Sequence, residues 1–379
     1  MKTTLLTVAG LMAAALCLAA APSDEVPGVG EPGGPTHELD GEEMRQWLRG
    51  REVFDRDFSA ADGVGAPHMN ADSCRACHQD PAMGGAGALD VNVSRFGRNF
   101  GGAGPFENLP GGQMYSKLQP PPSGVRENAH EDADVFEQRQ TPSALGDGLI
   151  ETIPEAVILA NEDPDDDDGD GIRGVARILM VAGQPEVGRF GWKAQVPTLH
   201  DFVRDAMGGE CGITTPDDGR GFSMLEDGDD VDDPELSLQD AEDIDFFLEN
   251  LGPPLRGGST AMEVRQGEAL FSALRCDRCH IPTLPGTEGP VNLYSDLLLH
   301  NVHKPGFRGM DDPGAPSGWY RTPPLWGIKD TAPYMHDGRA YDLVQAIKQH
   351  SGEARFSAVG YEALSDQEQQ ALIAFLEDL

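Results

Sequence analysis

The chain has few basic residues for its length, and this shortage limits its partners. Among 379 residues there are 28 lysines and arginines against 64 aspartates and glutamates, which gives a formal net charge of −36. So large an acidic excess repels phosphate backbones and anionic lipid headgroups. We therefore expect no nucleic acid and no anionic membrane surface as a partner. A protein attracted by the charge would be basic, unless the charge serves only solubility.

Long apolar runs are also missing, except at the N-terminus. Residues 1–20 have a basic start, an apolar stretch from Leu5 to Leu18 and a small-residue end, the organisation of a secretory signal peptide. The run is too short to span a bilayer, and no later segment has the length of a membrane helix. We therefore expect a periplasmic or otherwise exported protein. Lipidation at Cys17 is a minor alternative, because Leu16 stands where a lipoprotein site takes a small residue.

Cysteine is scarce, and its placement argues against a disulfide framework. Exported chains commonly pair their cysteines, but here one of the six lies in the signal peptide. Four of the other five form two Cys-x-x-Cys-His motifs, made of Cys74, Cys77 and His78 and of Cys276, Cys279 and His280. Cys211 is left outside the motifs, and we expect it to be a buried, inert thiol rather than a redox group.

Cys-x-x-Cys-His is the attachment site of a c-type haem. The two thiols bond to the vinyl groups of the porphyrin, and the adjacent imidazole is placed to ligate the iron. Two copies predict two covalently bound c-type haems with His78 and His280 as proximal ligands. Structural zinc is the weaker alternative, because it does not require a histidine directly after the second cysteine.

The segments around the two motifs repeat each other. Three pairs of segments match: residues 50–54 with 267–271, 141–146 with 322–327, and 236–251 with 364–379. The first pair contains small residues that would let one helix approach another closely. The last pair begins with Ser237 and Ser365, each followed three residues later by an acid, the pattern of a capping box. The order of helix, motif, Thr-Pro segment and closing helix occurs twice, which predicts a duplicated cytochrome c-type module.

These repeats predict a mainly α protein with two cytochrome c-type helical domains in tandem, the first carrying a long loop-rich insertion. The predicted divisions are a disordered leader at 21–40, a first domain at 41–253 with its insertion at about 155–235, a linker within 252–260 and a second domain at 261–379. The linker contains a Pro-Pro pair that is expected to stop the preceding helix.

The acidic part of the insertion has the spacing of a metal-binding loop. Asp166, Asp168 and Asp170 alternate along the chain and are followed by Gly171, which resembles the first half of a calcium loop. The distal glutamate of an EF-hand is missing at its expected spacing. The two alternatives are therefore calcium bound by these aspartates and an ordinary solvated acidic turn.

The ligand opposite the proximal histidine decides what each haem can do. A haem with that position filled only transfers electrons, whereas a haem with that position open can bind a small oxidant. For the second haem the candidate is Met335, whose thioether would raise the potential of the iron; a core-filling methionine is the alternative. Met335 follows the second Thr-Pro segment, and Pro154 follows the first Thr-Pro segment at the same distance along the chain. Proline has no ligating side chain. We therefore expect an open first haem. The alternative ligands for it are His68, His130, Met83 and Met114.

Glu151 stands three residues before Pro154. A carboxylate over an open haem could take the proton from peroxide and return it to the departing oxygen. The alternative role of Glu151 is to cap the turn that follows it.

Motifs in both halves resemble those of the bacterial di-haem cytochrome c peroxidases and their methylamine-utilisation relatives. In the second half the resemblance lies in residues 321–323 and 332–338. Segments at 140–142, 163–165, 188–193 and 295–300 are similar to one branch, the di-haem oxidoreductase family. The resemblance covers most of residues 40–379 and implies two c-type haems, a high-potential iron ligated by Met335 and a peroxidatic iron at His78.

The resemblance also implies residues beside the irons. In the peroxidases a glutamine and a glutamate attend the open iron, and Gln138 or Gln140 and Glu151 are the nearest matches. The peroxidases place a tryptophan between the haems, for which Trp192 is the candidate. A tryptophan packed in the core or against one haem is the alternative.

Three functions fit these features. The first is an exported di-haem oxidoreductase of the peroxidase type, in which the His78 haem reduces peroxide or another small oxidant with electrons relayed through the haem of His280 and Met335. The second is a non-catalytic di-haem electron carrier with both irons fully ligated. The third is an oxygen-dependent oxidase of an organic or protein substrate. The expected redox partner is a small cytochrome or a cupredoxin-like donor.

Overall fold

The computed structural model describes residues 26–379 except 66–68, 103, 110–113, 115–116 and 119–128. Within this part of the chain the helices are α1 (Gly41–Asp55), α2 (Asp147–Glu151), α3 (Glu155–Leu159), α4 (Leu199–Ala206), α5 (Leu238–Glu249), α6 (Met262–Ala273), α7 (Leu343–Gln349), α8 (Arg355–Glu362) and α9 (Asp366–Leu376). The strands are β1 (Val93–Gly97), β2 (Val135–Arg139), β3 (Ile178–Val181), β4 (Gln184–Val187), β5 (Leu284–Gly286), β6 (Gly289–Val291), β7 (Leu299–Asn301) and β8 (Trp319–Arg321). The strands of the described chain pair as two-stranded antiparallel ribbons, β1–β2, β3–β4, β5–β6 and β7–β8. Helices take up more of the chain than strands do, but small sheets that were not predicted lie beside them, so a mainly α fold is not confirmed.

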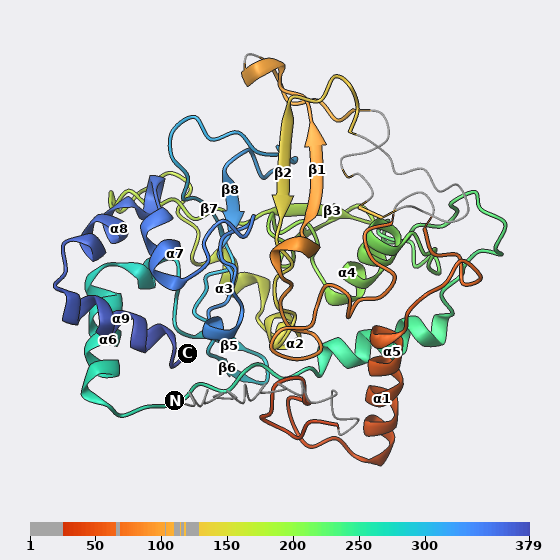
Figure 1. The fold of residues 1–379 in the computed structure, drawn as a ribbon, viewed down its shortest axis with the longest axis horizontal. Coiled ribbons are helices and arrows are strands. Elements are labelled where there is room, and N and C mark those ends of the chain that lie inside the picture. The colour runs from red at the N-terminus through yellow and green to blue at the C-terminus, as the bar shows by residue number, and fades with distance from the viewer. Residues whose placement is uncertain (1–25, 66–68, 103, 110–113, 115–116, 119–128) are drawn as a thin grey trace, which may run out of the picture.

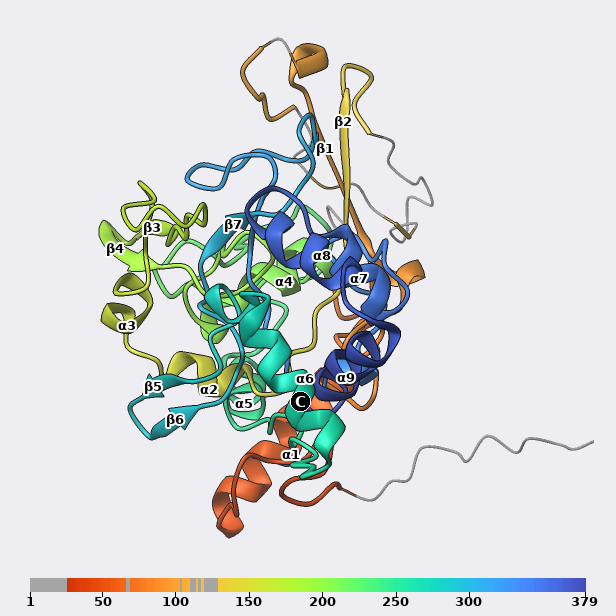
Figure 2. The same cartoon turned by 90° about the vertical axis from the view of Figure 1, so that its left-hand side faces the viewer.

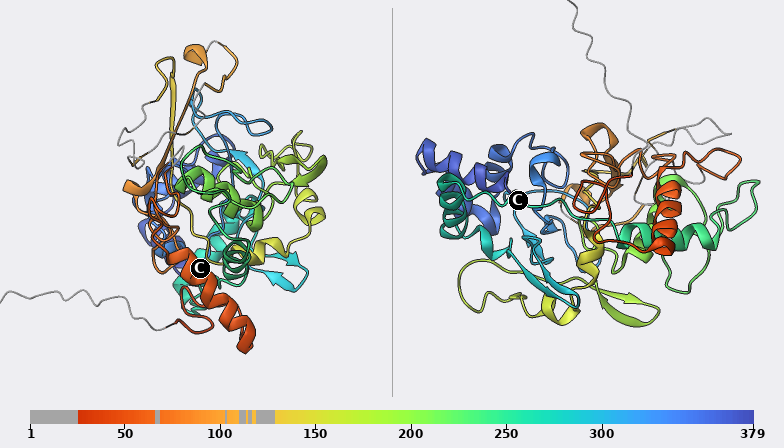
Figure 3. Two further views of the ribbon diagram at one scale, coloured as in Figure 1. Left: turned by 90° about the vertical axis from the view of Figure 1, so that its right-hand side faces the viewer. Right: turned by 90° about the horizontal axis from the view of Figure 1, so that it is seen from below.

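Two pairs of crossed helices lie on opposite sides of the fold. α1 packs against α5 and α6 against α9, and Figures 1 and 3 show the two pairs separated by the ribbons and loops. A Cβ on Gly50 would overlap the carbonyl oxygen of Asp243, and a Cβ on Gly267 would overlap that of Ala371. Only glycine allows two backbones to approach this closely. The close approach predicted from the small residues is confirmed.

The first turns of α5 and α9 differ. At α9, Ser365 accepts from the Glu368 amide while the Glu368 side chain accepts from the Ser365 amide, so the predicted capping box is complete. At α5, Ser237 accepts from the Asp240 amide. The Asp240 carboxylate pairs with Arg56 at 3.0 Å, so the predicted box is only half formed.

The leader is ordered where it meets the end of α5. Residues 33–35 are buried, and the Thr36 amide donates to the Asn250 carbonyl at 2.8 Å. The prediction of a disordered leader over 21–40 is wrong for these residues, because their backbone groups find long-range partners that composition does not reveal. α5 itself ends at Glu249, before the proline pair that was expected to stop it.

The larger hydrophobic core takes side chains from both halves of the chain. Phe54 and Phe247 come from α1 and α5, Phe190 from the insertion, and Leu293 and Trp326 from the second half. The insertion is therefore part of the core, with α3, β4 and α4 packed on it. A smaller core lies among α6, α7, α8 and α9, which Figure 2 shows side by side. The division into two domains stays a prediction.

The β1–β2 ribbon projects from the body at the top of Figure 1. Along β2 the side chains of Val135, Glu137 and Arg139 are buried, while Phe136 and Gln138 are exposed. This period of two is that of a strand with one covered face. No helix of the described residues is long and apolar enough to cross a membrane.

Candidate functional site

Each Cys-x-x-Cys-His motif forms one tight turn. The His78 amide donates to the Cys74 carbonyl at 3.0 Å, and the His280 amide donates to the Cys276 carbonyl at 2.9 Å. The turn gathers two thiols and an imidazole, which attachment to one porphyrin requires. The cysteines that the structure describes are all unpaired. Burial raises the pKa of Cys74 and of Cys276 to about 12.

The two histidines are held in the same way. His78 Nδ1 lies 3.1 Å from the Gly85 carbonyl oxygen, and His280 Nδ1 lies 2.9 Å from the Tyr294 carbonyl oxygen. Donation from Nδ1 to a carbonyl leaves Nε2 as the ligating nitrogen and fixes the direction of the ring. Burial lowers the pKa of both histidines to about 4. Both are therefore neutral near pH 7, which is the form that binds a metal.

A phenylalanine at the same position of the repeat lies beside each of the two histidines. Phe54 lies 6.1 Å from the His78 ring and 5.4 Å from the Phe247 ring, measured between centroids. Its counterpart Phe271 lies 6.4 Å from the histidine of the second motif and 5.3 Å from Phe375. In each half the aromatic pair joins the two crossed helices to the motif. The helix pairs thereby fix the position of both histidines.

The two Thr-Pro segments make equivalent contacts. Ala144 of the first segment donates from its amide to the Gly84 carbonyl at 2.8 Å, and Leu325 of the second donates to the Leu293 carbonyl at 3.0 Å. Gly84 and Leu293 each precede the residue whose carbonyl receives the histidine. The repeat found in the sequence is thus a repeat of contacts, which supports a duplicated module.

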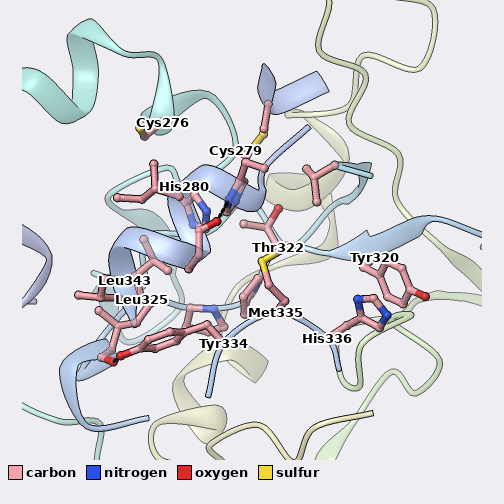
Figure 4. A pocket seen from close by; sticks show the side chains of 18 of the residues that line it. Cys276, Cys279, His280, Tyr320, Thr322, Leu325, Tyr334, Met335, His336 and Leu343 are labelled. Atoms are coloured by element: carbon pink, nitrogen blue, oxygen red, sulfur yellow. Dashed lines mark hydrogen bonds between the residues drawn. The ribbon is translucent and has the colours of Figure 1, made fainter. Parts of the chain in front are cut away.

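A large apolar cavity adjoins the second motif. Its lining includes Cys276, Cys279 and His280 together with Met335. Figure 4 shows the Met335 sulfur pointing toward the side of the cavity where His280 and Cys279 lie. Thiols and an imidazole on one wall, a thioether on another and an apolar lining between them fit a c-type haem.

The loop that carries Met335 is fixed by its own backbone. Tyr334 and Ala340 exchange amide–carbonyl hydrogen bonds of 2.7 and 3.3 Å, and the Gly338 amide donates to the Met335 carbonyl at 3.1 Å. Met335 has a φ of 71°, a left-handed conformation that is rare for a residue of this size. Such strain persists where the surroundings impose it, and it concentrates at functional positions.

In the first half of the chain, Pro154 stands at the position that corresponds to Met335. Gly146 and Gly327 both have a left-handed φ, 87° and 62°, so the chain leaves the two Thr-Pro segments in the same way. Beyond Gly146 the chain forms α2 and then reaches Pro154, which is exposed and precedes α3. This position offers no ligating side chain, and the open first haem stays a prediction.

The three candidates for residues beside the first iron have different contacts and exposure. The Glu151 Oε1 atom accepts from the Leu199 amide at 2.7 Å, which ties α2 to the start of α4. Gln140 is buried, its Nε2 donates to the Gly87 carbonyl at 3.0 Å, and it lines the cavity of the second motif. Gln138 is exposed on the outer face of β2. Glu151 therefore has the kind of structural contact that was its alternative, although the element it caps is α4.

Three of the four alternative ligands for the first iron lie in the described part of the chain. His68 lies outside the described residues. His130 Nδ1 accepts from the Asp132 amide at 3.2 Å. Met83 packs against the larger core, and Met114 is 8 % exposed.

The structure places charged groups near the first motif, and sequence reasoning did not identify these groups. Burial raises the pKa of Asp205 and of Glu210, and the nearby Arg95 opposes both shifts. Burial raises the pKa of Cys77 to about 11, with the Glu210 charge adding to the shift. Cys77, Arg95 and the segment with Asp205 and Glu210 come from separate parts of the chain, and no local pattern marks them.

The acidic loop of the insertion gathers a different trio from the predicted one. Carboxylate oxygens of Asp163, Asp166 and Asp168 lie within 4.8 Å of one another. Asp170 lies instead 3.6 Å from Arg278 Nε. The Asp166 Oδ1 atom also accepts from a local amide, that of Gly171, at 2.9 Å, as in an acidic turn. Calcium binding stays a prediction.

Two further residues named from the sequence are placed by the fold. Cys211 is 3 % exposed, and burial raises its pKa well above the usual range, so it is the buried thiol that was predicted. Trp192 Nε1 donates to the Gln140 carbonyl at 2.7 Å, and its ring lies 6.4 Å from that of His336. Trp192 lines the cavity of the second motif; its position relative to the first haem stays a prediction.

The chain is similar to proteins of one sequence family and to two solved structures. No curated protein matches it. One structure is of a MauG-like protein associated with microbial copper homeostasis, with 17 % identity, 95 % of each chain covered and a TM-score of 0.45. The other is hydrazine synthase of Kuenenia stuttgartiensis, with 16 % identity, 100 % of each chain covered and a TM-score of 0.45. The family described as "Di-haem oxidoreductase, putative peroxidase" matches residues 120–379. Because this match covers more than half of the chain, the protein belongs to the di-haem oxidoreductase family.

Proposed function

We propose that this protein is an exported di-haem c-type cytochrome oxidoreductase of the peroxidase type. One haem is held by Cys74, Cys77 and His78, and the other by Cys276, Cys279, His280 and Met335. The observation that carries the proposal is the apolar cavity with the second motif on one side and the Met335 thioether on another. The matched contacts of His78 and His280 extend the proposal to the first motif.

A bound haem supplies an iron that exchanges single electrons and, where a position is open, takes up a small oxidant. The chain's own groups ligate and orient. The Gly85 and Tyr294 carbonyls hold the imidazoles with Nε2 free to ligate. The apolar lining around the second motif would exclude water from a bound haem, and Met335 would hold the iron through its thioether, a ligand that raises the potential of a haem iron.

The first iron is the proposed site of peroxide reduction, because the position equivalent to Met335 is the exposed Pro154. Glu151 is the proposed group that takes a proton from one peroxide oxygen and returns it to the other. Burial raises the pKa of Glu151, which suits a carboxyl that must also hold a proton. Of the two glutamines, the buried Gln140 is the stronger candidate, because Gln138 faces outward from β2.

Covalent haem content tests the foundation of the proposal. A haem stain on a denaturing gel and quantification of released pigment should give two covalent haems per chain. The double substitutions Cys74→Ala with Cys77→Ala and Cys276→Ala with Cys279→Ala should each remove one. A colourless wild-type protein would contradict the proposal and favour the zinc alternative. Metal analysis tests calcium, and the N-terminal sequence of the mature chain tests export.

Spectroscopy and peroxide then separate the three functions. The peroxidase requires a high-spin ferric signal from one haem and rapid reoxidation of the reduced protein by peroxide. Two low-spin haems without reaction with peroxide, before and after partial reduction, would identify an electron carrier. Oxygen uptake that depends on an organic or protein substrate would identify the oxidase.

Substitution of Glu151 tests its role in proton transfer. Glu151→Gln should slow the reaction with peroxide by roughly 10²–10⁴, whereas Glu263→Gln, at an exposed position of α6, should not. Equal rates in both variants would remove Glu151 from the mechanism and leave its contact with α4 as its role.

A further inference from the structure

Tyr320 and Glu137 form a buried phenol–carboxylate pair beside the second haem site. The Tyr320 hydroxyl donates to Glu137 Oε2 at 2.6 Å, and the two residues are 5 % and 6 % exposed. Tyr320 lies on β8 and Glu137 on β2, strands that are far apart in the sequence. A phenol and an acid buried together lose hydration on both sides, which is unfavourable unless their hydrogen bonds replace it.

The carboxylate is held in place by further donors. The Met310 amide donates to the same Oε2 atom at 2.7 Å, and Arg139 Nε donates to Oε1 at 2.8 Å. Donors on both oxygens fix the orientation of the carboxylate. The hydroxyl proton of Tyr320 is therefore directed at a base that is already in position.

The ring of Tyr320 is in contact with the wall of the haem cavity. His336, the neighbour of Met335, stacks on Tyr320 with ring centroids 3.9 Å apart and an angle of 16°. Figure 4 shows the two stacked rings beside Met335, and all three residues line the cavity. An aromatic contact thus leads from the phenol to the residue next to the proposed iron ligand.

A purely structural role is the competing explanation. Arg139 also lies 3.5 Å from Asp312, and Lys193 Nζ lies 4.6 Å from the centre of the Tyr320 ring. Such a network ties the β1–β2 ribbon to β8. It requires a hydrogen bond between Tyr320 and Glu137, but it does not require the proton to move, and this difference can be measured.

We propose that Tyr320 is a redox relay that gives one electron to the haem held by His280 and Met335 while its hydroxyl proton passes to Glu137. The proposal rests on the proposed function, because hydrogen peroxide is the oxidant. Peroxide takes up two electrons and two protons and yields two waters. Tyr320 supplies one electron, relayed through the second haem, the external donor supplies the other, and both protons come from the solvent. The O–H bond of Tyr320 breaks and an O–H bond forms on Glu137 Oε2, which leaves a neutral tyrosyl radical.

Glu137 is essential to this step because of burial. Removal of an electron alone would leave a cation in a site that water does not reach, and an unpaired buried charge is strongly unfavourable. When the donor returns an electron to the radical, the proton moves back from Glu137 and both residues are restored. No proton has to cross the protein in either direction.

The test is rapid-freeze electron paramagnetic resonance of the holoprotein after mixing with peroxide. The wild type should show a tyrosyl radical, and Tyr320→Phe, which keeps the ring stack, should lack it. Tyr341→Phe is the matched control, because Tyr341 is 64 % exposed, and it should keep the signal. In Glu137→Gln the amide oxygen still accepts a hydrogen bond but takes no proton, so radical formation should slow by roughly 10² or more.

Three outcomes would overturn the relay: a full signal in Tyr320→Phe, unchanged radical formation in Glu137→Gln, or equal rates of formation in the wild type in H₂O and D₂O. The isotope measurement uses only the wild type, so it remains valid where a variant does not fold. Optical spectra of the same samples separate this proposal from the proposed function. Haem spectra that peroxide leaves unchanged would refute the proposed peroxidase function. In that case a photogenerated ruthenium(III) complex replaces peroxide as the one-electron oxidant in the test of the relay. Haem oxidation without a tyrosyl radical under either oxidant would refute the relay alone.

Discussion

At the scale of single residues, burial changes the acidity of groups that the sequence presents as ordinary surface acids. Asp147 opens α2, and burial raises its pKa to about 7 from 3.8, although the charge of Arg321 opposes the shift. Between pH 3.8 and about 7 the unfolded chain releases a proton that the folded chain keeps. The free energy of unfolding therefore falls as the pH rises through this window. Below the window Asp147 is protonated in both states and does not destabilise the fold.

Asp147→Asn should remove this pH dependence, because an amide does not ionise. At pH 8 the variant should be more stable than the wild type by on the order of 3 kcal/mol, and at pH 4 the two should be nearly equal. Urea unfolding at the two pH values measures the difference. Asp230→Asn, at an exposed position, is the control. Parallel pH profiles for wild type and Asp147→Asn would contradict the assignment.

Met335 can be tested without reference to turnover. Replacement of a thioether by an imidazole lowers the potential of a haem iron. Met335→His should therefore lower the midpoint potential of one haem, on the order of 0.1–0.3 V within the roughly 0.8 V that axial ligands span, and leave the other unchanged. Met180→His, at a residue that is 69 % exposed, should leave both potentials as they are. An unchanged titration of the Met335 variant would make this methionine a core residue.

At the scale of elements, the two helix pairs hold the two Cys-x-x-Cys-His turns in position. Gly50 and Gly267 allow α1 and α6 to touch the backbones of α5 and α9, and Phe54 and Phe271 of the same helices contact the two motif histidines. A change at a helix crossing should therefore reach the adjacent haem.

Gly267→Ala should separate α6 from α9 and destabilise the protein by about 1–3 kcal/mol, because the added methyl group meets the Ala371 carbonyl. The second haem should become easier to perturb, with its spectrum changing at a lower urea concentration than that of the first. Ser272→Ala, on the exposed side of α6, is the matched control. In Gly50→Ala the spectrum of the first haem should change at a lower urea concentration than that of the second. Equal stability of Gly267→Ala and Ser272→Ala would show that the crossing tolerates a larger distance.

At the scale of the whole molecule, the net charge of −36 governs encounter with a partner. Opposite charge raises association rates by about 10–10³ at low ionic strength, and salt screens the effect. Reduction by a basic small cytochrome should therefore slow by roughly tenfold or more between low and high salt. Stopped-flow measurement with an uncharged reductant provides the control, which should change little. A rate that rises with salt would mean that the natural donor is acidic or docks through a local basic patch.

Much of the candidate site could be predicted because its chemistry is local. A haem attachment motif needs two thiols and an imidazole within one turn of chain, and both turns form as the spacing implies. The repeated segments also predicted the close helix crossings at Gly50 and Gly267. These features depend on residue type at fixed spacing, which is what a sequence records.

The remaining features depend on which distant segments meet. Glu151 meets the start of α4, and Glu137 meets Tyr320 across the fold. Such pairs come together because one hydrophobic core draws side chains from both halves and from the insertion. The sequence by itself determined the haem motifs, the duplication and the overall charge. Only the tertiary structure decided which acids are buried and what they contact, because burial and long-range hydrogen bonds arise from packing rather than from spacing along the chain.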